Sequence, residues 1–337
     1  MVDVFYSGSQ TNALMILESA YGTPSGTINK PLGGQIQSIS FTAKNNLVEV
    51  GTAGARATQQ VIPMMFDVDG TIEMIFQNGK LLAYGLGGDT YGTGTHTLSL
   101  ADVLSSFSLQ LSADSSADSV WKIFGCVVSS LRLSMSLDSP LTLSVDFIGQ
   151  TTQYLETAGS YTPVANTVIA PQFIPSGAGA GVLKINSTAV AQVQSLEFTL
   201  DNGIERIHTA GSRLVTGVAA KRRTGTLRFT VMGENATLNA MFKRSLNPAA
   251  SGLPYSPAAG ALTSADSIIQ FDNSSVTGGA ATAGITINLK DIVVNDIQLS
   301  VPVDGMVTAD ISAIWTTLDG TTPMAIIDST TSSTYIS

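Results

Sequence analysis

Polar and apolar residues alternate along much of this chain. Clear examples are the runs 106–111, 131–137 and 141–147, in which every second residue is apolar. A period of two is typical of antiparallel strands with one buried face and one exposed face. Turn-forming pairs such as Asp69-Gly70 and Asn78-Gly79 separate several of these runs. The pattern predicts a mainly β protein.

Two short segments depart from this alternation. Residues 79–85 have the composition of a short helix. Residues 236–244 place Leu238, Met241 and Phe242 on one stripe and end in two basic residues, as a helix prefers. We therefore predict one short helix in each half of the chain.

The chain contains an internal repeat. Between residues 37 and 56, nine of twenty positions are identical to the residues 157 positions later. They are Gln37, Ser38, Phe41, Thr42, Asn45, Thr52, Ala53, Gly54 and Arg56. Further on, residues 131–134 resemble 297–300 at an offset of 166, and the triplet at 70–72 resembles the triplet at 225–227. The order of similar segments predicts two copies of one β domain of about 150 residues.

The domain boundaries follow from this repeat. We expect a first domain at 1–155, a linker at 156–180 and a second domain at 181–337. The linker contains three prolines and a Gly-Ala run, which suits a connection across a surface. Two similar domains make similar contacts twice, so three chains would provide six equivalent positions around a ring.

The repeated loop is the candidate contact between subunits. Loops usually diverge after duplication, so identical residues in both copies suggest a shared role. The candidate residues are Asn45, Thr52, Gly54 and Arg56, with their counterparts Asn202, Thr209, Gly211 and Arg213. The alternative is a tight turn in which Arg56 and Arg213 each bond a carboxylate inside their own domain. The sequence leaves both interpretations open.

Composition narrows the classes of protein. Charged residues make up 12% of the chain, about half of the usual share, and the net charge is −9. A surface with few charges suits burial against other subunits, although a neutral globular protein would also have one. The mean hydropathy of +0.26 excludes intrinsic disorder, and the single cysteine excludes a disulfide scaffold. The negative net charge argues against a protein that binds nucleic acid along its whole surface. No run approaches the roughly 20 apolar residues of a membrane span, and the first residues do not look like a signal peptide.

Several short motifs resemble the tail tube (major tail) proteins of long-tailed phages and related archaeal viruses, in their duplicated-domain form. These motifs are Ser7-Gly8-Ser9-Gln10, the segment 18–24 (ESAYGTP), the loop from Asn45 to Arg56, and Gly125-Cys126-Val127. The resemblance implies two tandem β-sandwich or barrel-like domains, each flanked by a helix. It also implies trimeric rings with pseudo-sixfold symmetry, stacked into a hollow tube that delivers DNA to the host.

The resemblance also sets expectations about partners and place. The chain would contact itself within and between rings, and would meet the tail terminator, tape measure and tail tip proteins. Genomic DNA would pass through the lumen without specific binding, and no membrane would be involved. The protein would reside in the virion tail, and in the host cytoplasm during assembly. Acidic residues on one sheet face would line the lumen and repel the DNA phosphates.

Candidate chemistry is sparse. His96 and His208 occur in non-matching contexts, and Cys126 lies in an alternating run where a small core residue is expected. We therefore predict no catalytic, cofactor-binding or metal-binding residues, no cofactor and no enzymatic activity. The basic cluster 221–223 could contact an acidic neighbour or form a solvated hairpin tip. The competing functions are another self-assembling β shell or surface-array protein and, with less support, an outer-membrane porin.

Overall fold

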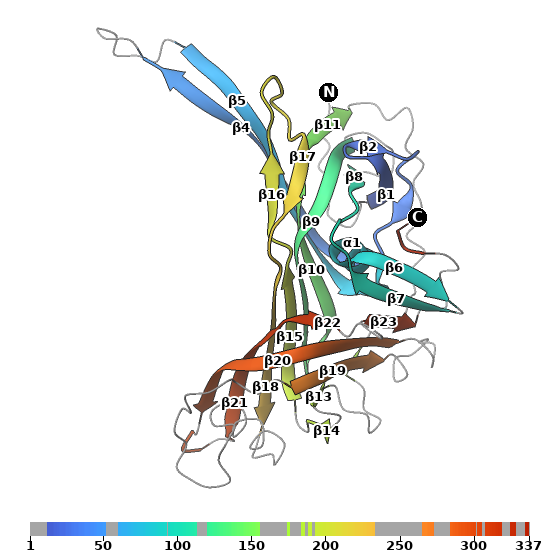
Figure 1. Cartoon of the computed structure of the whole chain (residues 1–337), viewed down its shortest axis with the longest axis vertical. Coiled ribbons are helices and arrows are strands. Elements are labelled where there is room, and N and C mark those ends of the chain that lie inside the picture. Colours follow the sequence, from blue (N-terminus) through green and yellow to red (C-terminus); the bar gives the residue numbers. More distant parts are fainter. Residues whose placement is uncertain are drawn as a thin grey trace, which may run out of the picture.

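The structure is a computed structural model that describes residues 12–51, 60–92, 94–112, 120–155, 174–175, 183–185, 188–190, 193–232, 265–272, 284–300, 302–304, 307–318, 324–327 and 334–336. Eight strands form one antiparallel sheet, called the main sheet, in the order β4-β5-β10-β9-β15-β18-β21-β20 (Figure 1). Their bounds are β4 Gly34–Val50, β5 Gln60–Phe76, β9 Val120–Ser136, β10 Ser139–Gly149, β15 Val193–Asp201, β18 Thr224–Met232, β20 Gly284–Ser300 and β21 Thr308–Trp315. The mainly β prediction is confirmed.

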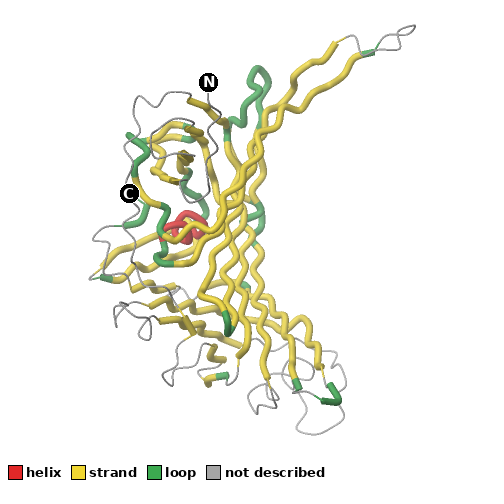
Figure 2. The backbone as a smooth tube through the Cα atoms, turned by 180° about the vertical axis from the view of Figure 1, so that it is seen from behind, coloured by secondary structure: helices red, strands yellow, loops and turns green. Residues whose placement is uncertain are grey.

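Most of the other described elements cover one face of the main sheet, and none of them lies over the opposite face, which we call the bare face (Figures 1 and 2). The covering elements are β1 Asn12–Ala20, β2 Thr23–Pro24, β3 Lys30–Pro31, α1 Lys80–Leu86, β6 Gly87–Gly92, β7 Thr95–Leu100, β8 Phe107–Ser112, β11 Thr151–Leu155, β12 Ile174–Pro175, β13 Leu183–Ile185, β14 Thr188–Ala189, β19 Ala265–Asp272, β22 Thr317–Leu318 and β23 Met324–Ile327. The core lies between these layers, and its largest fully buried side chains include Tyr84, Phe107, Phe147 and Phe198. A hairpin of β16 Ile204–Ile207 and β17 Gly217–Ala220 continues beyond β15 and β18.

Two long strands pass from the covering layer into the main sheet. The first part of β9 pairs with β8 and β11, and its last part pairs with β10 and β15. In the same way, the first part of β20 pairs with β19, β22 and β23, and its last part pairs with β21. A β-bulge marks each crossing, between Val128 and Ser130 in β9 and between Val294 and Asp296 in β20. A bulge adds a residue that bends the strand, which lets one strand serve two layers.

Strand pairing follows the same register in both halves of the main sheet. The pair Ile39↔Ile72 in β4 and β5 corresponds to Leu196↔Phe229 in β15 and β18, with both residues shifted by 157. The bulges that open these hairpins, at 36–38 and 193–195, keep the same offset. The pairs of β9 with β10 correspond to those of β20 with β21 at an offset of 166, bulge included.

One alignment expected from the sequence is wrong. The register places Gly70 level with Leu227, two residues away from Gly225. Each glycine makes room for an aromatic ring on the adjacent strand, because a Cβ atom would lie 2.3 Å from Phe147 at Gly70 and 2.0 Å from Trp315 at Gly225. Phe147 and Trp315 lie at different positions in the strand pairing of the two halves. The glycines opposite them therefore differ in position as well.

Helix α1 confirms the first of the two helices expected from the sequence. It spans seven residues, all buried, and ends at Gly87, whose left-handed backbone (φ 94°) allows its N–H to bond Ala83. Gly85 lets α1 lie against Leu131 of β9, because a Cβ there would be 2.2 Å from that side chain. The second expected helix, 236–244, lies outside the described residues.

The C-terminal region returns to the first half of the chain. Strand β23 pairs with β7 through the pairs Met324↔Leu98 and Ile326↔His96. Tyr335 stacks on the fully buried ring of His96, with ring centroids 3.6 Å apart, and its backbone N–H donates to Asp89. The two halves are therefore tied together both in the main sheet and in the covering layer.

Candidate assembly surfaces

The two outermost strands of the main sheet have exposed edges. These strands are β4 on one side and the last part of β20 on the other, and within the described residues neither has a second neighbour there. Leu299 of β20 is 60% exposed, and Ile39 and Phe41 of β4 are partly exposed. Edge strands with apolar side chains readily pair with another chain. These edges are the first candidate assembly surface.

The bare face of the main sheet is polar and predominantly acidic. Its acidic residues include Asp69, Glu73, Asp146, Glu197, Asp201, Asp296 and Asp310, and its basic residues include Lys44, Arg132 and Arg228. Neighbouring hydroxyls hold several of the carboxylates in place. Thr71 and Ser130 each donate to Asp146 at 2.7 Å, and Ser38 donates to Glu73 at 2.9 Å. The result is a surface of negative charges, several of them held in place, with interspersed hydroxyls.

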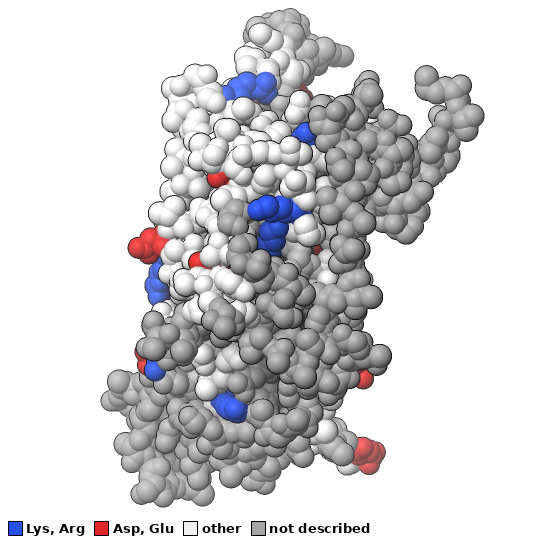
Figure 3. Space-filling model, turned by 90° about the vertical axis from the view of Figure 1, so that its right-hand side faces the viewer, with Lys and Arg blue, Asp and Glu red and all other residues white. Residues whose placement is uncertain are grey.

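The opposite side of the molecule looks different. Figure 3 shows the side of the covering layers, where the described atoms are mostly uncharged and the few charged groups are scattered. The carboxylates named above therefore lie on the bare face and not on the side that Figure 3 draws.

Each half of the main sheet extends into a hairpin that projects beyond it (Figure 1). We call residues 45–50 and 60–66 the first arm, and β16, β17 and the loop 208–216 the second arm. The first arm exposes six large apolar side chains, each 38–56% exposed. They are Leu47, Val48, Val61, Ile62, Met64 and Met65. Such a concentration on a projecting hairpin is typical of a surface that another protein covers.

The opposite end of the main sheet also carries exposed apolar residues. Leu137, in the turn between β9 and β10, is 60% exposed, and Val303, in the turn between β20 and β21, is 100% exposed. The two residues are 166 positions apart, the offset that relates these hairpins. Neither residue was predicted from the sequence, although apolar residues at this offset, each followed by an aspartate, were the available signal.

The second arm lies against the first arm through Arg213. The guanidinium of Arg213 donates to the Met64 carbonyl and to the Asn45 side chain, both at 2.8 Å, and Phe66 donates its N–H to the Arg213 carbonyl at 2.8 Å. Nearby, Arg206 pairs with Asp67 and Asp69, and His208 lies 3.4 Å from Asp67. These contacts join residues that lie more than 130 positions apart, so no local sequence pattern could reveal them.

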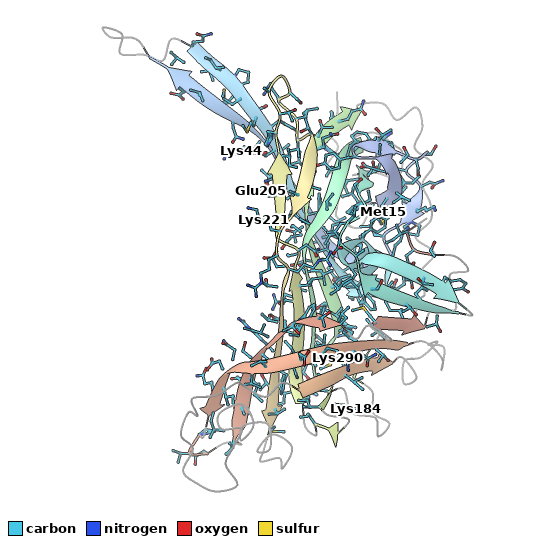
Figure 4. The ribbon with its side chains drawn as sticks, viewed as in Figure 1. Met15, Lys44, Lys184, Glu205, Lys221 and Lys290 are labelled. Carbon is cyan, nitrogen blue, oxygen red and sulfur yellow. The ribbon has the colours of Figure 1, made fainter. Side chains whose placement is uncertain are left out.

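Asn202 lies in the interior of the protein, where the two halves of the chain meet. Its side chain is fully buried and donates to the carbonyls of Gly85 at 2.9 Å and Val128 at 3.1 Å. It accepts a bond from Arg223 at 3.0 Å, and Arg223 also donates to the carbonyl of Ala101. Burial lowers the pKa of the Arg223 guanidinium. The basic cluster 221–223 is therefore divided, because Lys221 instead pairs with Glu205 at 2.7 Å on the surface (Figure 4).

The other candidate contact residues have varied surroundings. Asn45 is exposed in β4 and is held by Arg213. Thr209 and Gly211 are exposed in the loop of the second arm, where Gly211 has a left-handed backbone (φ 94°). Thr52, Gly54 and Arg56 lie outside the described residues.

The segment 18–24 has a structural role in the covering layer. Glu18 is buried and accepts bonds from Ser108 at 2.6 Å, the Gly125 N–H at 2.7 Å and the Gly22 N–H at 2.8 Å. Burial raises the pKa of the neighbouring Tyr21 and Cys126, and the Glu18 carboxylate adds to both effects. A buried thiol that resists ionisation is a poor nucleophile.

The described residues offer little catalytic chemistry. His96 lies 3.1 Å from Asp89, but both side chains are enclosed between β6, β7 and Tyr335. Among the residues described, no group of three or more His, Cys, Asp or Glu side chains could hold a metal ion. No helix in the described part of the chain has the length and apolar character needed to cross a membrane.

Comparison with known proteins identifies a matching family. A protein-family model described as "phage tail tube protein" matches residues 8–244, which is more than half of the chain. A search of curated proteins finds no significant match. The matched region includes β4, β5, β9, β10, β15 and β18, together with both arms.

Proposed function

This chain belongs to the phage tail tube protein family and is a structural protein of the virion tail, and we propose that it assembles into trimeric rings that stack into a DNA-conducting tube. The observation that carries this proposal is the shape of the main sheet, which has two open edges and an internal junction, β9 with β15, between its two halves. A contact of the same kind between copies would join β20 of one chain to β4 of the next.

Ring formation follows from repeating this contact. In this proposal the chain is a tandem duplication, with domains at 1–155 and 181–337 joined by the linker 156–180. Three chains would then place six similar units around one axis, with head-to-tail contacts that close. Their main sheets would contribute 24 strands to one closed barrel. Barrels of about 16–18 strands already enclose a water-filled channel.

The bare face would line this channel. The covering layers occupy the other face of the main sheet, so a closed barrel would have them on its outside (Figure 1). The acidic groups would then repel DNA phosphates at close range, since charges are screened over about 8 Å at physiological salt.

Stacking would use the two ends of the main sheet. The apolar first arm projects from one end, and Leu137 and Val303 are exposed at the other. Arms of one ring would cover the turns of the next, so rings would stack with one polarity. Arg56, the counterpart of Arg213 at an offset of 157, would also contact a neighbouring copy in this proposal.

The same proposal covers partners and place. Rings at the ends of the tube would meet the tail terminator and the tail tip proteins, and the lumen would hold the tape measure protein and later the DNA. Assembly would occur in the host cytoplasm. No catalytic step is part of this function.

Electron microscopy of the concentrated protein, together with native mass spectrometry, tests the proposal. We expect hollow tubes or rings by microscopy. In mass spectrometry, a single ring should have the mass of three chains. Leu299→Lys should abolish assembly while leaving the circular dichroism spectrum unchanged, because a lysine replaces an apolar side chain at the edge. Val103→Lys, at an exposed apolar residue outside the main sheet, is the matched control and should assemble normally. Flat arrays, closed shells or a strictly monomeric wild-type protein would refute the proposal.

The role of the lumen charges has its own test. In phage that carry Asp146→Asn or Asp146→Lys, DNA ejection should become slower in that order, because each step removes repulsion at the channel wall. Ejection kinetics identical to those of the wild type in both variants would contradict the assignment of the bare face to the lumen.

A further inference from the structure

We infer that β20 of one copy pairs with β4 of the next in the register Asp296↔Lys44, Gln298↔Thr42 and Ser300↔Ser40. This inference rests on the proposed self-assembly and adds to it the residues that meet. The partner is a second copy of this chain.

The internal junction provides the template. Strands β9 and β15 pair antiparallel through Ser130↔Asp201, Arg132↔Thr199 and Ser134↔Glu197. Each residue of β9 has its counterpart in β20 at an offset of 166, and each residue of β15 has its counterpart in β4 at an offset of 157. Replacing both strands by their counterparts converts the internal register into the register inferred between copies.

The apolar residues buried at the internal junction of β9 and β15 correspond to apolar residues that are exposed or partly exposed on β20 and β4. In the internal junction, Leu133 and Phe198 lie opposite each other, and both are 0% exposed. Their counterparts are Leu299, which is 60% exposed, and Phe41, which is partly exposed. The inferred register places Leu299 opposite Phe41 on the covered face, where each would bury the other. The apolar residues at the edges are thus the ones that the template buries.

Charge supports the same register independently. The internal junction has Asp201 opposite Ser130 and an ion pair between Arg132 and Glu197. The edges lack that ion pair, because the counterparts of Arg132 and Glu197 are Gln298 and Ser40. Instead, Lys44 meets Asp296, and opposite charges stabilise a cross-strand pair. A slip of two residues would place Lys44 opposite Gln298 or Val294 and would lose this pairing.

The side chains involved point to the correct side. Lys44 projects from the side of the main sheet that faces away from Met15, which lies in the covering layer (Figure 4). Asp296 lies on the bare face, beside Asp310 and Gln298. Both members of the inferred pair therefore belong to the same face of the continuous sheet.

Disulfide trapping tests the register. The variant carrying Thr42→Cys and Gln298→Cys places the two thiols directly opposite each other between copies, at a Cα separation that a disulfide spans. Within one chain these positions lie on the two outermost strands of the main sheet, about 34 Å apart at about 4.8 Å per strand, so an intramolecular disulfide cannot form. The native Cys126 is fully buried and adds no background. Oxidation of assembled protein should give covalent dimers and trimers in denaturing electrophoresis.

Mismatched pairs are the controls. Thr42→Cys with Ser300→Cys, and Thr42→Cys with Asp296→Cys, displace one thiol by two residues and should cross-link at least about tenfold more slowly. If a mismatched pair cross-links faster than the pair Thr42→Cys and Gln298→Cys while rings are visible by microscopy, the inferred register is wrong but the proposed assembly into a tube is not contradicted. If wild-type protein forms no rings or tubes under any condition, the proposed function itself fails.

A charge exchange gives a second measurement. Lys44→Asp or Asp296→Lys alone should raise the concentration needed for half-maximal assembly by about two- to thirtyfold, because each replaces an attraction with a repulsion. The double variant, with both changes, should restore assembly to within about threefold of the wild type. Additive losses in the double variant would overturn the inferred pair.

Discussion

Asn202 provides the sharpest test of how the two halves are held together. In Asn202→Ala, the buried carbonyls of Gly85 and Val128 lose a donor, and the partly buried Arg223 guanidinium loses an acceptor. Leaving buried polar groups unpaired costs about 1–3 kcal/mol each, and partial relaxation reduces the sum. We expect the free energy of unfolding to fall by about 3 kcal/mol.

Urea unfolding under conditions that keep the chain monomeric would measure this loss. Trp121 in β9 and Trp315 in β21 report on the two halves by fluorescence. Asn45→Ala is the matched control, because Asn45 is the counterpart of Asn202 but is exposed and bonds only Arg213 among the described hydrogen bonds. It should cost no more than about 1 kcal/mol. An unfolding midpoint for Asn202→Ala equal to that of the wild type would refute the role given to this contact.

Two further predictions concern packing and pH. Gly70→Ala should lower the free energy of unfolding by about 1–3 kcal/mol, because the added methyl group meets the Phe147 ring, whereas Gly51→Ala, which meets nothing within 4 Å, should be nearly neutral in the same urea titration. Burial, with a smaller effect of Lys30, lowers the pKa of Lys80 from 10.5 to about 8, so between these values the unfolded chain binds more protons and stability should rise with pH by up to about 3 kcal/mol. Lys80→Met should remove that rise, and an equal slope in both proteins would show that another group causes it.

Local patterns in the sequence predicted the character of the fold well. Period-two alternation identified strands such as β10, where Leu141, Leu143 and Val145 are buried and the residues between them are polar. Helix α1 was also found, from a short apolar segment behind a turn. These features depend on which side chains face the core, and that choice is encoded in the order of the residues themselves.

Long-range features were less accessible. The sequence aligned Gly70 with Gly225, but the register follows the rings of Phe147 and Trp315, which lie on other strands. The contact of Arg213 with the first arm was also invisible, because its partners lie more than 140 residues away. Which strand neighbours which is decided by packing, and similar strands offer many competing pairings.

By itself the sequence determined that the chain is built from alternating strands, that its segments recur at offsets of 157 and 166, and that chemistry-bearing side chains are few. Only the tertiary structure decided which copy of each segment is inside and which is at an edge. Asn45 and Asn202, like Phe41 and Phe198, are the same residue at the same offset, yet Asn45 is exposed and Phe41 partly exposed, whereas Asn202 and Phe198 are buried. The reason is that β15 has β9 beside it and β4 has no such neighbour among the described residues, and burial depends on that neighbour rather than on the residue.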